Sequence, residues 1–177
     1  MQAIIFLLDA AISFFCMLFL LRFMMQAMRL SFNGQLGTFV VALTNWAVKP
    51  LRRIIPGIGG LDWSSIFAAY ALQLLLTGIV VGLSSRFGEA DIAGLAPTIL
   101  WFALRALLRL AVYIMIGALI LQAVLSWINP YSPLSAPAQQ LTSPLLDPIR
   151  RFVPLIGGID LSPLVAILLL QALLMFL

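Results

Sequence analysis

Two copies of one stretch decide the fold: Pro50-Leu-Arg-Arg-Ile-Ile-Pro-Gly-Ile-Gly-Gly-Leu-Asp-Trp-Ser64 and Pro148-Ile-Arg-Arg-Phe-Val-Pro-Leu-Ile-Gly-Gly-Ile-Asp-Leu-Ser162. Nine of the fifteen positions are identical without a gap. The similarity extends to Leu43–Gln73 and Leu141–Gln171, where 14 of 31 positions match at a constant offset of 98. The chain is therefore one unit of roughly 80 residues that is used twice.

The composition indicates a membrane protein. The chain is 63% hydrophobic and 9% charged, with a mean hydropathy of +1.14. In a soluble domain about a quarter of the residues are usually charged. A soluble domain of this length has no core large enough to bury so many apolar residues. A membrane-spanning helix needs roughly 20 mostly apolar residues. Four runs predict such helices: 4–21, 66–83, 110–128 and 164–177.

These spans predict an all-α, polytopic membrane fold with about four transmembrane helices. The first unit covers residues 1–83 and the second covers residues 97–177, with a linker at 84–96. Each unit holds two spans, so both have the same orientation, as a parallel repeat with a pseudo-two-fold axis along the membrane normal. The last run stops at the end of the chain, and we expect the natural protein to continue for a few residues.

The basic residues predict the orientation, because short cytoplasmic loops are enriched in Lys and Arg. The loops inside the units contain Arg22, Arg29, Lys49, Arg52, Arg53, Arg150 and Arg151. The linker has only Arg86, against Glu89 and Asp91. We expect the loops inside the units to be cytoplasmic. The termini and the linker are expected outside, which is the periplasm in a Gram-negative bacterium.

Each intra-unit loop is predicted to contain a short surface helix. The segment 34–48 has Leu36, Phe39, Val40, Leu43 and Ala47 on one helical face, which is the spacing of an amphipathic helix lying on a membrane. The second copy is richer in proline, and its helix is expected to begin near Pro137. Pro50 and Pro148 are expected to end or kink these helices.

The duplicated stretch combines a basic pair, a turn and a helix start. The arginines Arg52, Arg53, Arg150 and Arg151 are expected at headgroup level, where phosphates accept their hydrogen bonds. The turn is assigned to Pro56, Gly59, Gly60, Pro154, Gly157 and Gly158, whose glycines allow positive φ. Ser64 and Ser162 are expected to be N-caps, so that Asp62 and Asp160 can reach an arginine of their own unit.

Three interpretations of this stretch stay open at this point. It can be an interface anchor followed by a helix start. It can be a paired surface that docks lipid or protein. It can also be a re-entrant loop, because interrupted apolar segments at matching places in two halves mark binding sites in transporters. The arginine pairs argue against deep re-entry.

A few polar residues lie near or within the apolar runs. At the upstream offset of 96, Asp9 aligns with Arg105, and Arg109 shares a helix face with Arg105. We expect Asp9 to pair with Arg105 or Arg109 across the two halves, unless both arginines snorkel to the outer interface. Gln73 and Gln171 recur in the second and fourth spans, where an amide favours a contact between helices over a substrate ligand.

The sequence favours no enzyme and no bound cofactor. The chain has no histidine, which is the commonest general base and metal ligand. Its single cysteine, Cys16, lies in the first apolar run and is expected to face lipid or the core. There is also no phosphate-binding glycine motif and no nucleophile beside a base.

In the second unit the duplicated arginine–proline–glycine stretch follows the segment Ser126-Trp127-Ile128-Asn129-Pro130. Together these motifs resemble the YggT family, also called YlmG-like. The resemblance covers almost the whole chain as two consecutive units. In the first unit Ser31-Phe32-Asn33-Gly34 departs from the pattern. Members are multi-pass membrane proteins of bacteria and plastids. Some are associated with haem attachment during cytochrome b6f assembly and some with nucleoid distribution, and many of their genes lie near division genes.

The resemblance and the residues together predict a non-enzymatic assembly or scaffold protein of the bacterial inner membrane. Its arginine-rich loops would bind anionic lipid headgroups and other membrane, division or assembly proteins. Homo-oligomerisation stays open, and no direct nucleic-acid partner is expected. The alternative is a small channel or transporter for ions or osmotic balance, formed where the two units meet or in an oligomer.

Overall fold

The computed structural model describes residues 2–57, 59–83, 92–153 and 160–177, and within these residues the fold is all-helical. Its six helices are α1 (Gln2–Ala27), α2 (Gln35–Leu51), α3 (Trp63–Leu83), α4 (Ile92–Ile128), α5 (Ser135–Arg150) and α6 (Ser162–Phe176). No strand occurs in the described part of the chain. The predicted all-α fold is therefore confirmed.

Three helices are long and apolar enough to cross a membrane. These segments are Ala3–Ala27 in α1, Trp63–Gly82 in α3 and Gly94–Ile128 in α4. The fourth apolar helix, α6, is shorter, with 15 residues. Helix α4 has 37 residues, so it is about 55 Å long at 1.5 Å per residue. It exceeds the roughly 30 Å of a bilayer core, which leaves it free to tilt or to extend beyond the membrane.

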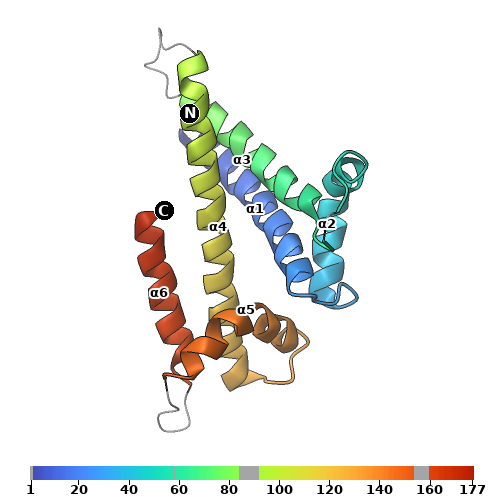
Figure 1. Cartoon of the computed structure of the whole chain (residues 1–177), viewed down its shortest axis with the longest axis vertical. Coiled ribbons are helices and arrows are strands. Elements are labelled where there is room, and N and C mark those ends of the chain that lie inside the picture. The colour runs from blue at the N-terminus through green and yellow to red at the C-terminus, as the bar shows by residue number, and fades with distance from the viewer. Residues whose placement is uncertain (1, 58, 84–91, 154–159) are drawn as a thin grey trace.

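The two units run in the same direction (Figure 1). Helices α1 and α4 descend in this view, α2 and α5 follow at their lower ends, and α3 and α6 return upward. Each unit is thus a helical hairpin with a short helix at its closed end. This arrangement is the parallel repeat that the sequence predicts.

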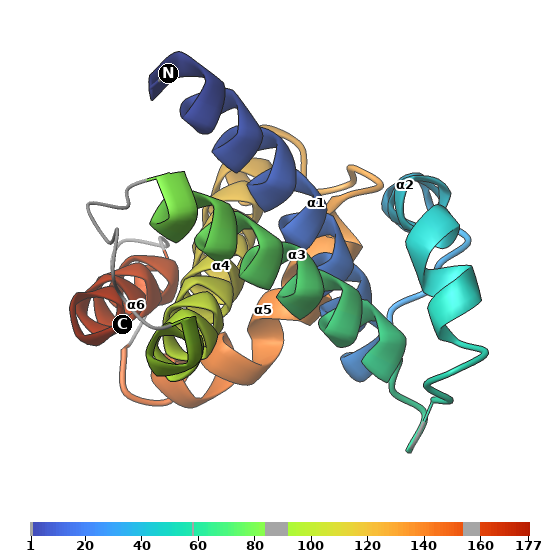
Figure 2. The same cartoon turned by 90° about the horizontal axis from the view of Figure 1, so that it is seen from above.

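The packing of the two hairpins is unequal. Helix α3 packs against both α1 and α4, and α1 also contacts α4. An exact two-fold axis would pair α6 with α1 as closely as α3 with α4, but in the described chain α6 packs mainly on α4 and α5. Viewed from above, α2 and α6 lie on opposite sides of the molecule (Figure 2). The expected pseudo-two-fold axis is therefore not realised in the packing.

The core lies mainly inside the first hairpin. Its largest fully buried side chain is Phe19, which packs with Cys16, Leu20, Val48 and Ala69. Of the two environments predicted for Cys16, lipid or core, the structure shows the core. A second cluster contains Leu18, Met25, Leu30 and Val40 together with Leu141 from α5. The second unit therefore inserts a leucine into the core of the first.

The helix boundaries differ from the expected positions by a few residues. Helix α4 begins at Ile92, inside the expected linker 84–96, of which residues 84–91 lie outside the described residues. Helix α2 ends at Leu51, one residue beyond Pro50. Helix α5 begins at Ser135, two residues before Pro137. A proline is tolerated in the first turn of a helix, so it marks the helix start only approximately.

The face of α2 that the protein buries only partly coincides with the predicted apolar face. The fully buried residues are Gly37, Val40, Thr44 and Val48. Of the predicted face, Val40 is buried, Leu36, Leu43 and Ala47 are half-buried against the core, and Phe39 is exposed. Two contacts turn the helix this way. Gly37 lies directly on the backbone of Phe32, where no side chain fits, and Thr44 binds an arginine of α1.

Candidate functional site: two arginine–aspartate collars

In each unit the duplicated stretch connects the short helix to the returning apolar helix, and we call 50–64 the first collar and 148–162 the second collar. In the first collar Arg52 and Asp62 form a bidentate pair. Arg52 Nε donates to Asp62 Oδ1 at 3.2 Å, and the second nitrogen, Nη2, donates to Oδ2 at 2.5 Å. This hydrogen bond raises the pKa of Arg52 above its ordinary value, although partial burial opposes the shift. The expected arginine–aspartate contact within the unit is present.

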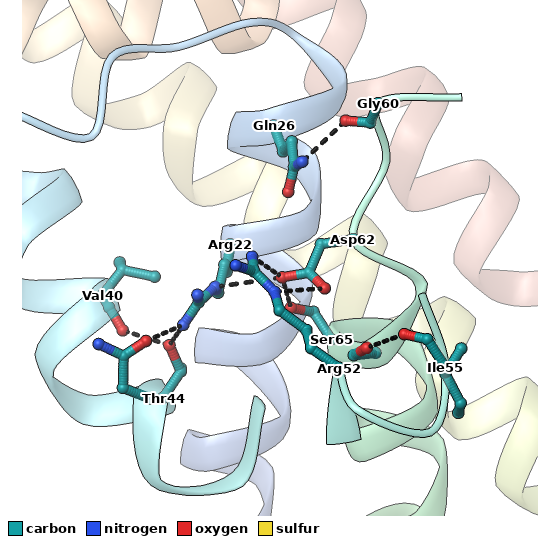
Figure 3. Close-up of polar contacts among 11 residues, drawn as sticks. Arg22, Gln26, Val40, Thr44, Arg52, Ile55, Gly60, Asp62 and Ser65 are labelled. Atoms are coloured by element: carbon teal, nitrogen blue, oxygen red, sulfur yellow. Dashed lines mark hydrogen bonds and ion pairs between the residues drawn. The ribbon is translucent and has the colours of Figure 1, made fainter. Parts of the chain in front are cut away.

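Asp62 also contacts a second arginine, which comes from α1. Arg22 Nε lies 3.5 Å from Asp62 Oδ2, and the two side chains are only 5% and 2% exposed. Arg22 Nη1 donates to Thr44 Oγ1 at 2.6 Å and to Asn45 Oδ1 at 3.1 Å. Figure 3 shows Arg22 between Thr44 on one side and Asp62 on the other. The buried charges are thus paired, and the network joins α1, α2 and the start of α3.

At the start of α3, Ser64 does not have the predicted role of N-cap. Ser65 donates its hydroxyl to Asp62 Oδ2 at 3.0 Å, while Ser64 donates to the carbonyl oxygen of Ile55 at 2.8 Å. Ser64 is therefore not the N-cap, because the helix already begins at Trp63. Its hydroxyl instead ties the helix start to the preceding turn of the collar.

The turn of the first collar has the predicted backbone. Gly59 and Gly60 have φ values of 68° and 77°, which non-glycine residues rarely adopt. Gln26 donates to the carbonyl oxygen of Gly60 at 2.7 Å, so α1 also holds this turn. Pro56 precedes it on the surface. The matching residues Pro154, Gly157 and Gly158 lie outside the described residues.

The second collar has the same pair, but its aspartate is more exposed than Asp62. Arg150 Nη2 lies 2.9 Å from Asp160 Oδ2, and the exposed fractions are 36% and 30%. Asp147 adds a longer contact to Arg150 at 3.8 Å. Desolvation alone would raise the pKa of Asp160, but hydrogen bonds from Ser162 and Arg150 hold this pKa below its ordinary value.

The helix start of the second collar also differs from the prediction. Helix α6 begins at Ser162, so this serine is the first helical residue and not the N-cap. Its backbone N–H donates to Asp160 Oδ1 at 2.9 Å, so Asp160 satisfies one N–H group at the helix start. The buried Ser162 hydroxyl has no partner among the described residues. Pro163 follows in the first turn of α6, as expected.

The two collars diverge where α1 and α4 approach them. At the offset of 96, Ala118 stands at the position that corresponds to Arg22. In the second unit Thr142, the counterpart of Thr44, donates instead to Gln122 Oε1. A neutral hydrogen bond therefore replaces the buried arginine network of the first unit.

The two arginines of each basic pair have different environments. The side chains of Arg52 and Arg150 are held by aspartates, whereas those of Arg53 and Arg151 are exposed and form no ion pair or hydrogen bond with any other described residue. The next residue of each collar is apolar and exposed, namely Ile54 at 78% and Phe152 at 86%. Each collar thus presents one charged and one apolar side chain side by side.

The polar residues of the spans lie away from the collars. Asp9, Gln73, Arg105 and Arg109 line one pocket, but within the described chain no ion pair joins Asp9 to either arginine. Gln73 is buried, whereas its counterpart Gln171 is exposed, because α3 packs between α1 and α4 while α6 has a free side. The predicted ion pair is thus not formed, although its members face the same pocket.

Sequence reasoning missed the central role of Arg22, Thr44 and Asn45. Two signals pointed to it. Arg22 is a charge at the end of an apolar helix, and Thr44 is repeated as Thr142 inside the matching segment. In the described residues no group of three or more His, Cys, Asp or Glu side chains is placed to hold a metal ion.

The comparisons with known proteins follow the same duplicated pattern. The CCB3/YggT family model matches the chain over two segments, residues 1–83 and 97–177. The chain belongs to the YggT family. It is 34% identical to the uncharacterized protein YggT of Escherichia coli K12 over 171 residues, which cover 96% of this chain and 86% of that protein. No solved structure matches this YggT-family chain significantly.

Two further relatives have similar coverage. An uncharacterized protein of Pseudomonas aeruginosa is 36% identical over 171 residues, which cover 96% of this chain and 85% of that protein. An uncharacterized protein of Vibrio alginolyticus, named for its position in the proC 3' region, is 34% identical over 172 residues, which cover 97% of this chain and 91% of that protein. The YggT-family similarity therefore includes both hairpins and both collars.

Proposed function

We propose that this YggT-family protein is a non-enzymatic assembly or scaffold factor of the bacterial inner membrane. Its two collars bind anionic lipid headgroups at the cytoplasmic surface and hold partner proteins there. The termini lie on the opposite side, in keeping with the distribution of basic residues. The amphipathic helices α2 and α5 accompany the collars along the membrane surface.

One observation carries this proposal. Each collar neutralises its inner arginine with its own aspartate and leaves the outer one exposed beside an apolar side chain. An arginine next to a side chain that can enter the lipid suits the headgroup region, where each basic residue contributes about 1 kcal/mol of attraction to anionic lipid. Ile54 and Phe152 supply the apolar part.

The different environments of the two arginines also explain why each collar has an adjacent pair. The inner arginine fixes the shape of the collar through a bidentate bond, which requires a planar guanidinium group. The outer arginine is then left exposed, with the donors of its side chain available to a ligand.

Site-specific photo-crosslinking in cells tests the proposal. A photoreactive amino acid replaces Ile54 or Phe152, and the matched control replaces Tyr131, which is exposed but lies outside both collars. We expect protein adducts from the two collar positions and not from Tyr131. These adducts should disappear when Arg53→Gln and Arg151→Gln are added.

Two results would contradict the binding of partner proteins by the collars. Adducts with lipid alone from both collar positions would show that the collars anchor the protein without docking a partner. Identical protein adducts from Tyr131 would show that the collars have no special role.

A further inference from the structure

A pocket of about 350 Å3 lies between the two units, near the helix ends opposite the collars. Its walls come from α1, α3 and α4 and from the end of α6. Its charged and polar lining residues are Asp9, Gln73, Thr77, Arg105 and Arg109, and Leu76, Val80 and Phe102 form part of its apolar lining. It combines three charges with a mostly apolar surface in the membrane-spanning part of the protein.

The deepest polar residue of the pocket is unsatisfied. Gln73 is 6% exposed, and its Oε1 accepts no hydrogen bond from any described residue. A buried carbonyl without a donor is unfavourable, and inside a bilayer no bulk water replaces the missing partner. A ligand that donates a hydrogen bond would remove this penalty.

The charges of the pocket do not balance. Arg105 and Arg109 carry two positive charges and Asp9 carries one negative charge, so the side chains of the lining have a formal charge of 2 − 1 = +1. Arg105 donates to the carbonyl oxygen of Phe176 at 3.0 Å, which uses only part of its donor capacity. In the described chain none of the three charged groups forms an ion pair. An anionic group would complete the pocket.

The exposure of the lining residues indicates from where a ligand enters. Asp9, Phe102 and Arg109 are exposed at the rim, whereas Gln73 and Leu76 are buried at the base. The described helices α1, α3 and α4 are long and apolar enough to cross a membrane, so we expect the medium at the rim to be lipid. A ligand that combines an anionic polar group with long apolar chains matches both the charges and the apolar walls.

We propose that this pocket binds one phospholipid with a net negative headgroup that carries hydroxyl groups, as phosphatidylglycerol does. Its phosphodiester accepts hydrogen bonds from Arg105 and Arg109, and a headgroup hydroxyl donates to Gln73 Oε1. Its acyl chains lie along the apolar wall. A zwitterionic lipid leaves the positive charge of the pocket uncompensated.

The test is a lipid titration of the purified full-length protein, followed by native mass spectrometry. All measurements use an Arg53→Gln, Arg151→Gln background, so that lipid on the collars does not contribute. We expect phosphatidylglycerol to bind roughly tenfold more tightly than phosphatidylcholine, which corresponds to one charge-assisted hydrogen bond. Arg109→Gln and Gln73→Leu should each remove this preference, and Arg109→Lys should retain most of it.

Three results would overturn the proposal. Equal binding of the two lipids would rule out charge recognition by the pocket. A preference that survives Gln73→Leu and Arg109→Gln would place the lipid elsewhere. Displacement of the lipid by millimolar glycerol phosphate or inorganic phosphate would identify a soluble anion as the ligand. The melting temperature of each variant in the same detergent separates lost binding from lost folding.

Discussion

Arg22 of α1 and Asp62 at the start of α3 meet where both side chains are almost fully buried, with Arg22 Nε 3.5 Å from Asp62 Oδ2. This contact joins α1 to α3 at the closed end of the first hairpin, whose two helices are otherwise held mainly by apolar packing. Arg52, Ser65, Thr44 and Asn45 complete its coordination. The first collar is thus built around a buried charge, and the second is not.

This difference predicts unequal effects of equivalent substitutions. Asp62→Ala leaves Arg22 buried without a counter-charge, and we expect it to lower the free energy of unfolding by roughly 3–5 kcal/mol. Asp160→Ala removes a partly exposed pair and should lower it by at most about 1 kcal/mol. Denaturant unfolding in detergent micelles, monitored by circular dichroism, measures both. Equal losses would contradict the assignment of the first collar as the buried one.

The second collar predicts an acid-sensitive contribution to stability. The pKa of Asp160 is lower in the folded protein than its ordinary value of 3.8. The carboxylate therefore stabilises the fold above that ordinary value, and this contribution is lost as the pH falls through the folded pKa. We expect the melting temperature of the wild type to fall between about pH 4 and pH 2 by more than that of Asp160→Asn. Parallel curves for the two proteins would disprove the contribution.

The close approach of α2 to the turn before it predicts a steric effect. A Cβ atom on Gly37 would collide with the backbone of Phe32, whereas one on Gly78 in α3 would meet nothing within 4 Å. Gly37→Ala should destabilise the protein by about 1–3 kcal/mol, in the range of overpacking. Gly78→Ala, the control, should be neutral or slightly stabilising because alanine favours helix. Thermal unfolding of the two variants measures both effects.

The insertion of Leu141 into the first unit predicts that it couples the two hairpins. Leu141 is buried with Leu18, Met25 and Val40, and the neighbouring Gln140 donates to the carbonyl oxygen of Met28 at 3.0 Å. Leu141→Ala should cost about 2–5 kcal/mol. The exposed Leu169 of α6 provides the control, since Leu169→Ala creates no cavity. A split unfolding transition for Leu141→Ala, measured by calorimetry, would show that the units then unfold separately.

Much of the fold follows from repetition and hydropathy. The match between the collars predicted the parallel order of the units, and the free aspartates predicted the pairs Arg52–Asp62 and Arg150–Asp160. These features depend on residues close together in the chain. The glycine turn at Gly59-Gly60 is local in the same way.

The features that the sequence did not reveal depend on packing between distant segments. The buried face of α2 is set by Arg22 and by the backbone of Phe32, so the apolar stripe predicts it only in part and wrongly includes the exposed Phe39. Helix α6 has a free side, which no repeat pattern predicts and which leaves Gln171 exposed while Gln73 is buried. Asp9 failed to pair because its expected partners face the same pocket without reaching it.

The buried network of the first collar has a consequence for biosynthesis. All of its members lie between residues 22 and 65, so none waits for the second hairpin to be made. During synthesis domains fold in order from the N-terminus, and the first hairpin can close on its own charges while α4 is still inside the ribosome. The first hairpin is then already formed when α4 and Leu141 pack against it.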